Sequence, residues 1–140
     1  MRQPKEADRF EHAVAAWQKR VPWPEEILLP LAEHLFIVKK GERAIVKTTC
    51  GQELCAWNEP WPMHCRIIVR NTREKLLEIY PEEHLTINPD LIELREFICP
   101  GCGTLLDVDC VPPTYPIVQE FTPDLEGLYA WLGKPLPVKL

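Results

Sequence analysis

The feature that most constrains this chain is a pair of cysteines two residues apart, Cys99 and Cys102, within the sequence ICPGCGTLL at residues 98–106. Two thiolates at this C-x2-C spacing can face one metal ion across a tight turn. Gly101 and Gly103 allow the positive φ angles and the close backbone approach that such a turn needs. Because apolar residues lie on both sides of the turn, the segment predicts a zinc knuckle that is entered and left by β-strands.

A tetrahedral zinc site needs two further ligands. The best candidates are Cys50 and Cys55, which form a C-x4-C pair in the sequence CGQELC. Ligand spacings of two to four residues are usual for zinc, although the stretch between the two pairs is much longer than in a minimal zinc ribbon. A long insert between two knuckles is compatible with one site, so we expect the two pairs to bind the same ion.

Three other residues leave alternatives open. Cys65 and Cys110 lie in β-like runs, where a cysteine commonly serves as a small, reduced apolar side chain. His64 could replace one thiolate, but an isolated histidine is usually not a metal ligand. We therefore expect Cys65 and Cys110 to be buried, and we keep His64 as an alternative ligand.

Other uses of six cysteines fit the sequence less well. An even number permits a disulfide framework, but residues 1–8 lack the apolar region of a secretory signal peptide. In a reducing cytosol, where we expect this protein, a metal site is favoured over disulfides. A redox C-x-x-C motif opens a helix, whereas Cys102 leads into a β-like run. Bound iron and redox chemistry are the remaining alternatives to structural zinc.

The composition indicates a folded protein without a membrane span. The chain has 140 residues, for which one domain is the natural expectation, and 46% of them are hydrophobic, which argues against disorder. No apolar stretch approaches the length of a membrane-spanning segment. A net charge of −5 argues against a nucleic-acid partner, because such a partner requires a basic patch. The 15 prolines predict short elements joined by extended segments of the kind that drape over a partner protein.

The predicted fold is a small α+β domain with a zinc-ribbon-like antiparallel β core, an N-terminal helix, a C-terminal helix and extended proline-rich segments. We expect an N-terminal helical, partner-wrapping segment over residues 1–34, a β-rich zinc-binding core over residues 35–111, and a C-terminal helix and tail over residues 112–140. Apolar residues recur at helical spacing within residues 8–20, and short helices are expected within residues 24–34. The apolar stripe of the first helix could face the protein's own core or a partner.

Short or alternating apolar runs predict the strands of the core, at residues 35–38, 43–47, 65–69, 91–98 and 105–111. Residues 73–80 fit either a strand or a helix because their alternation is imperfect, and we take them as a strand. The charged residues of these strands are expected to face solvent. The C-terminal helix is expected to begin at Pro123 after Thr122 and to end before Gly133, at the C′ position. Trp57 and Trp61 lie in a proline-rich loop, which either packs over the metal site or anchors an interface.

Little in the sequence is typical of a catalyst. It contains neither a Gly-rich phosphate loop nor a nucleophile elbow. Four cysteine ligands would close the zinc shell and leave no position for an activated water. Asp107 and Asp109 share one face of a strand and could act as acid and base, but solvated carboxylates are commoner. The residues by themselves predict a non-catalytic zinc module, either a subunit or a free-standing ribbon that binds protein or nucleic acid. A rubredoxin-like electron carrier would instead require iron.

The C-terminal half carries a more specific pattern. It contains the sequences LREFICPGCGTLLDV at 94–108, YP at 115–116, PDL at 123–125 and YAWLG at 129–133. Upstream lie CGQELC at 50–55, Glu59, Trp61 and VRN at 69–71. From about residue 38 onward, this pattern resembles the small zinc-binding subunit of the acetone carboxylase and acetophenone carboxylase family.

The resemblance implies a role and a set of ligands. In this family, large hydantoinase-like subunits carboxylate ketones with ATP, bicarbonate and a divalent cation, while the accessory small subunit holds structural Zn2+ away from the chemistry. We therefore expect a cytoplasmic hetero-oligomer with such subunits as partners, without nucleic acid or membrane, and zinc ligands at Cys50, Cys55, Cys99 and Cys102. Other members often carry a cysteine two positions before Cys50, where this chain has Thr48. That difference and the short chain favour the acetophenone type.

Overall fold

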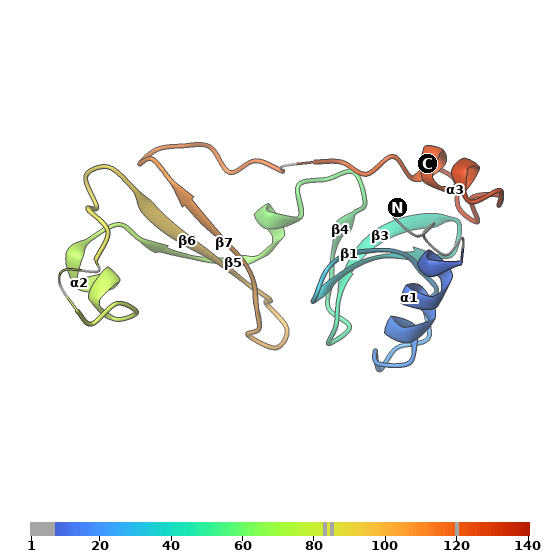
Figure 1. The fold of residues 1–140 in the computed structure, drawn as a ribbon, viewed down its shortest axis with the longest axis horizontal. Coiled ribbons are helices and arrows are strands. Elements are labelled where there is room, and N and C mark those ends of the chain that lie inside the picture. Colours follow the sequence, from blue (N-terminus) through green and yellow to red (C-terminus); the bar gives the residue numbers. More distant parts are fainter. Residues whose placement is uncertain (1–7, 83, 85, 120) are drawn as a thin grey trace, which may run out of the picture. The chain divides into compact units, whose positions relative to one another are not determined.

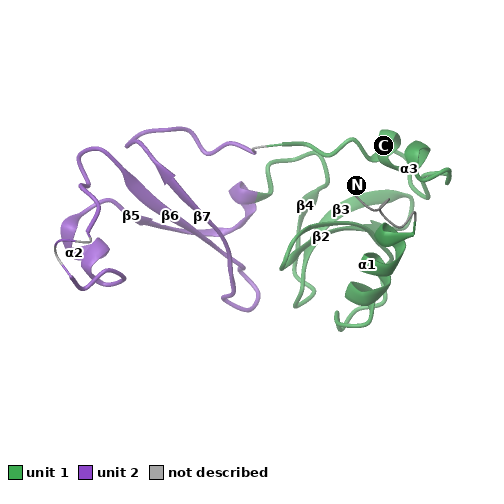
Figure 2. Ribbon diagram, viewed as in Figure 1, with its two compact units in different colours: residues 1–61, 120–140 green, residues 62–119 purple. Residues whose placement is uncertain are grey.

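The structure is a computed structural model that describes residues 8–82, 84, 86–119 and 121–140. Residues 1–7, where we expect no signal peptide, lie outside the described residues. The chain divides into two compact units, shown in Figure 2. The first unit comprises residues 1–61 and 120–140, and the second unit comprises residues 62–119. The division expected from the sequence, into residues 1–34, 35–111 and 112–140, stays a prediction.

The first unit is built on a four-stranded antiparallel sheet in the order β1-β2-β3-β4 (Figure 1). The strands are β1 (Ile27–Ala32), β2 (Leu35–Lys40), β3 (Arg43–Thr48) and β4 (Glu53–Ala56), and the helices of this unit are α1 (Arg9–Gln18) and α3 (Leu125–Trp131). Antiparallel strands flanked by an N-terminal and a C-terminal helix confirm the predicted α+β class. The strands predicted at residues 35–38 and 43–47 are present as β2 and β3, which form a hairpin around Gly41 with a φ of 63° at that glycine.

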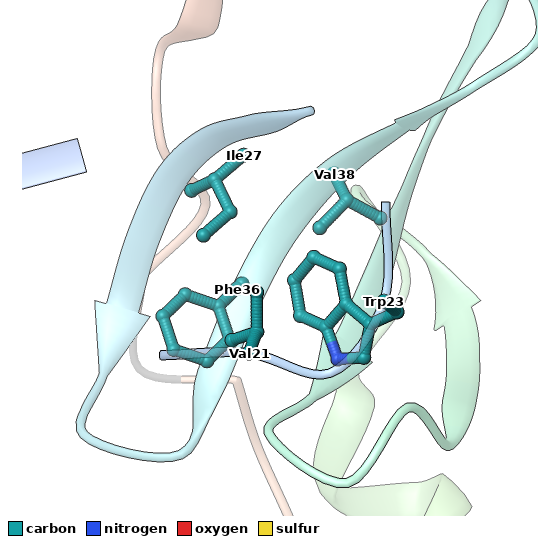
Figure 3. Packing of buried hydrophobic residues seen from close by; sticks show 5 residues of the cluster. All are labelled: Val21, Trp23, Ile27, Phe36 and Val38. Atoms are coloured by element: carbon teal, nitrogen blue, oxygen red, sulfur yellow. The ribbon is translucent and has the colours of Figure 1, made fainter. Parts of the chain in front are cut away.

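One face of this sheet is covered by α1 and the segment that follows it. The buried cluster on this face is shown in Figure 3 and consists of Val21, Trp23, Ile27, Phe36 and Val38. Val14 and Trp17 of α1 pack against it, and the Trp17 and Phe36 rings meet edge to face with centroids 5.3 Å apart. The apolar stripe of the first helix therefore packs on the protein's own sheet.

The opposite face of the sheet is covered by α3. Leu125 and Tyr129 of this helix pack on a buried cluster that includes Leu28 and Ile37. The Tyr129 hydroxyl donates to the Leu28 carbonyl at 3.4 Å, which ties the C-terminal helix to β1. Trp57 also packs on this cluster, so one of the two loop tryptophans contributes to the core of the first unit.

The ends of α3 correct one prediction and confirm another. The helix begins at Leu125 rather than at Pro123, because the Asp124 carboxylate caps it by accepting from the Gly127 amide at 2.8 Å. Asp is a stronger N-cap residue than Thr, so the helix starts after Asp124 and not after Thr122. Gly133, with a φ of 68°, follows the helix end as predicted.

The short helices predicted within residues 24–34 are wrong, because this segment forms β1. Ile27 and Leu28 are both buried, since the sheet is covered on its two faces. A strand that is buried on both faces loses its alternation of apolar and polar residues, and periodicity then cannot separate it from a helix. Pro30 is accommodated in the ladder because β1 is an edge strand.

The second unit is a three-stranded antiparallel sheet in the order β5-β6-β7. Its elements are β5 (Arg66–Arg70), α2 (Arg73–Leu77), β6 (Glu93–Ile98) and β7 (Leu105–Val111), and a 3-10 helix, η1 (Trp61–His64), precedes β5 in the chain. The strand predicted at residues 73–80 is wrong, because α2 occupies its first part. The Thr72 hydroxyl caps this helix by accepting from the Lys75 amide, and Leu76 is fully buried.

Charged residues of β6 lie inside the second unit rather than on a solvent face, which corrects the prediction for this strand. Glu93 and Arg95 are 7% and 6% exposed. Two nitrogen atoms of the Arg95 guanidinium contact Glu93 Oε1: Nε lies 2.7 Å from it and Nη2 lies 2.6 Å from it. The guanidinium also donates to the Tyr115 carbonyl at 2.5 Å, which fastens the chain beyond β7 to the sheet. Because each charge is paired, both can be buried.

A second ion pair of low exposure lies in the first unit. Lys47 is 5% exposed, and its Nζ lies 2.6 Å from Glu25 Oε1. The hydrogen bond from Lys47 lowers the pKa of the Glu25 carboxyl below its usual value. A carboxyl whose pKa is lower in the folded state stabilises the fold above its unfolded-state pKa of about 4.3. That stabilisation is lost as the pH falls through the folded-state pKa.

We expect the Glu25→Gln variant to have a shallower dependence of stability on pH in acid than the unaltered chain. The free energy of unfolding from urea denaturation, measured from pH 6 down to pH 3, should converge for the two proteins as the pH falls. Glu42→Gln is the matched control, because Glu42 pairs with Lys139 where both side chains are largely exposed. A Glu25→Gln curve parallel to that of the unaltered chain would contradict the assigned role of the pair.

Candidate metal centre

Cys99 and Cys102 lie on the turn that joins β6 to β7. The Cys99 amide donates to the Thr104 carbonyl at 2.8 Å, and the Gly103 amide donates to the Cys99 carbonyl at 3.0 Å. Gly103 has a φ of 79°, which favours glycine. These contacts close the turn tightly and bring the two sulfur atoms within 4.8 Å of each other. Two thiols at this separation could hold a metal ion.

The two thiols of this knuckle differ in their surroundings. Cys99 is 1% exposed, whereas Cys102 is exposed and its Sγ lies 3.1 Å from the Thr104 hydroxyl oxygen. A metal ion bound here would therefore have one ligand inside the second unit and one at its surface. Thiolates are soft ligands that select zinc and iron over magnesium or calcium. The chemistry of this donor pair fits the expected zinc, with two ligands still to be supplied.

Cys65, just before β5, is a third thiol in the second unit. It is half-buried, and burial, followed by the nearby Cys99, raises the pKa of its thiol to about 11. Such a thiol is protonated at neutral pH unless a metal ion displaces the proton. This agrees in part with the expected buried, reduced cysteine. The neighbouring His64 is exposed.

Cys110 does not have the predicted burial. It lies on β7 opposite Leu94 of β6 and is exposed. The reason is that β7 is an edge strand whose residues are mostly exposed or half-buried. All six cysteines fall within the described residues, and no two of them are joined in a disulfide.

Cys50 lies at the tip of the β3–β4 hairpin in the first unit. The Thr48 amide donates to the Gln52 carbonyl and the Gly51 amide donates to the Thr48 carbonyl, each at 2.9 Å. Gly51 has a φ of 97°, which a residue with a side chain rarely adopts. Cys50 is exposed at this tip, and its Sγ lies 3.2 Å from the Thr48 hydroxyl oxygen.

Cys55 lies further along the same hairpin, on β4 opposite Val46. It is half-buried, and its thiol donates to the Glu59 carbonyl at 3.7 Å. A Glu59 carboxylate oxygen also lies within 4.8 Å of the Cys55 sulfur, a neighbour that spacing rules for cysteine and histidine ligands do not point to. The C-x4-C pair is thus divided between the tip and a strand of one hairpin.

Asp107 and Asp109 share the face of the second sheet that carries Arg95. Asp107 is exposed and Asp109 is half-buried. Partial burial, followed by the charge of Asp107, raises the pKa of Asp109, while Arg95 opposes this shift. The pair therefore sits beside a guanidinium that is already engaged by Glu93 and the Tyr115 carbonyl.

Among the described residues, none of the helices combines the length and the apolar character needed to cross a membrane.

Comparison with known proteins gives consistent results. A family model described as "Acetone carboxylase gamma subunit" matches residues 21–132, a range that includes all six cysteines. The acetone carboxylase gamma subunit of Xanthobacter autotrophicus is 42% identical over 137 residues, covering 96% of this chain and 81% of that protein. The acetophenone carboxylase beta subunit of Aromatoleum aromaticum is 29% identical over 87 residues, covering 61% of this chain and 67% of that protein. On these matches, the chain belongs to the acetone carboxylase gamma subunit family.

Proposed function

We propose that this chain is the small, non-catalytic, zinc-binding subunit of an ATP-dependent ketone carboxylase and that it stabilises the assembly. The single observation that supports this most strongly is the 42% identity with an acetone carboxylase gamma subunit over nearly the whole chain. The identity with the acetophenone carboxylase subunit is lower and covers less of the chain. These values favour an acetone-type enzyme over the acetophenone type expected from the sequence.

Our proposal assigns one structural Zn2+ to Cys50, Cys55, Cys99 and Cys102. The tight turn that holds Cys99 and Cys102, and the two further cysteines on the β3–β4 hairpin, support this ligand set. Zinc supplies a strong cross-link between segments far apart in the chain, and four thiolates leave no open position for substrate or water. The residues of this chain would accordingly bind and orient the metal without taking part in carboxylation.

The chemistry would then belong to partner subunits. We propose large, hydantoinase-like subunits that use ATP, bicarbonate and a divalent cation, within a cytoplasmic hetero-oligomer. The relatives support a multi-subunit setting, since each is described as one subunit of a carboxylase. The net charge of −5 supports a protein partner rather than nucleic acid.

The test is native mass spectrometry of the tagged chain purified from its own host, with a metal count for each copy. We expect recovery in a large complex with hydantoinase-like large subunits and with one zinc ion bound to each copy of this chain. A tagged Cys110→Ser chain is the matched control, because that cysteine is exposed and outside the proposed ligand set. Recovery of this chain alone, or with nucleic acid in a strongly salt-dependent manner, would favour a free-standing zinc ribbon instead.

A further inference from the structure

The hairpin tip that carries Cys50 is held by a tryptophan from a distant part of the sequence. The indole Nε1–H of Trp23 donates to the Thr48 carbonyl and to the Thr49 carbonyl, each at 3.1 Å. These are the two carbonyl groups that immediately precede Cys50 in the chain. Trp23 is 8% exposed, so these hydrogen bonds are shielded from competing water.

The same indole ring is packed against the other side of the tip. A Cβ atom added at Gly51 would lie 3.2 Å from Trp23 Cδ1, which is tighter than an ordinary van der Waals contact. Gly51 is therefore needed twice, once for its φ of 97° and once for the close approach of the ring. The residues before and after Cys50 thus both contact Trp23.

The indole itself is fixed by the core of the first unit. Figure 3 shows the Trp23 ring beside Phe36 and Val38, and the Trp23 and Phe36 rings meet edge to face with centroids 5.9 Å apart. Lys47 Nζ lies 5.0 Å from the ring centroid and is held by Glu25. The ring therefore has little freedom to move, and neither has the N–H that it presents to the tip.

We propose that Trp23 is a positioning residue for Cys50: its indole fixes the backbone of the hairpin tip and thereby presents the thiol for metal binding. This inference rests on the proposed function, because it requires that Cys50 is a metal ligand. Binding to a preorganised ligand costs less conformational entropy than binding to a mobile one. Groups that orient a metal ligand without touching the metal typically change metal affinity by about 10–100-fold when they are removed.

The test compares zinc release from the full chain and from its Trp23→Phe variant. Phenylalanine retains an aromatic ring in the core but cannot donate to the Thr48 and Thr49 carbonyls. We expect zinc to pass to a chelator about 10–100-fold faster, and Co2+ in place of zinc to show altered sulfur-to-cobalt charge-transfer bands. Amide hydrogen exchange at Gly51 should also accelerate in the metal-free chain, because its hydrogen bond to Thr48 lies within the tip.

Two further variants separate positioning from general destabilisation. Trp57→Phe is the matched control, because Trp57 packs on the opposite face of the same sheet. It should leave zinc release unchanged even where it lowers thermal stability. Replacing Trp23 by benzothienylalanine, which keeps the bicyclic shape and exchanges the N–H for sulfur, should reproduce the Trp23→Phe effect without a cavity.

The outcomes distinguish this inference from the ligand assignment beneath it. Zinc release at the unaltered rate from both Trp23 variants, alongside loss of zinc from Cys50→Ser, would overturn the role of Trp23 alone. Unaltered zinc content in Cys50→Ser would overturn the assignment of Cys50 as a ligand, and the role of Trp23 with it. Faster release from the Trp23 variants with normal release from Trp57→Phe is the result that supports the proposal.

Discussion

The Cys99→Ser variant is expected to lose its metal ion and to leave residues 62–119 unfolded. Structural zinc contributes roughly 10–16 kcal/mol of apparent free energy, which equals or exceeds the total stability of a typical domain. Among the described residues of the second unit, few large apolar side chains are buried; Leu76, Leu94 and Phe97 are the main ones. A core of this size contributes little by itself, so the metal would carry much of the stability.

The measurement is zinc content by mass spectrometry, together with limited proteolysis of residues 62–119. Cys110→Ser is the matched control, because this exposed cysteine lies on β7 and should have almost no effect. Cys65→Ser should cost about 1–3 kcal/mol without loss of zinc, as expected for a half-buried thiol that is not a ligand. If Cys65→Ser or Cys110→Ser loses as much zinc as Cys99→Ser, the proposed ligand set is wrong.

The Arg95→Ala variant is expected to lose about 3–5 kcal/mol of unfolding free energy, the usual cost of breaking a buried ion pair by removing one partner. Glu93 would keep a carboxylate that is 7% exposed without the guanidinium that lies 2.6 Å from it. The Tyr115 carbonyl would also lose its donor, so the segment after β7 should become easier to cleave with proteases. Urea denaturation of the metal-loaded chain measures the loss.

A double substitution tests whether the loss of unfolding free energy comes from the Glu93 carboxylate that is left buried without a partner. The variant with Arg95→Met and Glu93→Leu replaces the pair by apolar side chains of similar size, and it should recover most of the lost stability. Arg66→Ala is the control, because Arg66 is an exposed arginine of β5 in the same sheet. An Arg95→Ala variant no less stable than Arg66→Ala would show that the buried pair contributes nothing.

Local patterns in the sequence were sufficient for the parts of the fold that depend on neighbouring residues. The knuckle turn follows from two cysteines and two glycines within five residues, and the strands on either side follow from their apolar runs. The β2–β3 hairpin follows from a glycine turn between apolar segments. The first helix follows from the helical spacing of its apolar residues, and the end of the last helix follows from Gly133.

Only the tertiary structure decided the features that depend on what lies across the sheet. β1 could not be recognised from the sequence, because α1 and α3 cover both faces of its sheet and this burial removes the alternation that marks a strand. Glu93 and Arg95 are buried because each neutralises the charge of the other, and because the Tyr115 carbonyl accepts a further hydrogen bond from Arg95. Cys110 is exposed because its strand lies at a sheet edge.

The candidate site shows the same division. The sequence by itself was enough to predict the four cysteines as ligands, because metal chemistry selects residue types and short spacings. It could not identify Trp23, which lies 25 residues before Thr48 and contacts the hairpin tip only after the chain has folded. A ligand is recognisable from its own chemistry, whereas the residue that holds a ligand in place is defined by packing between segments that the sequence keeps apart.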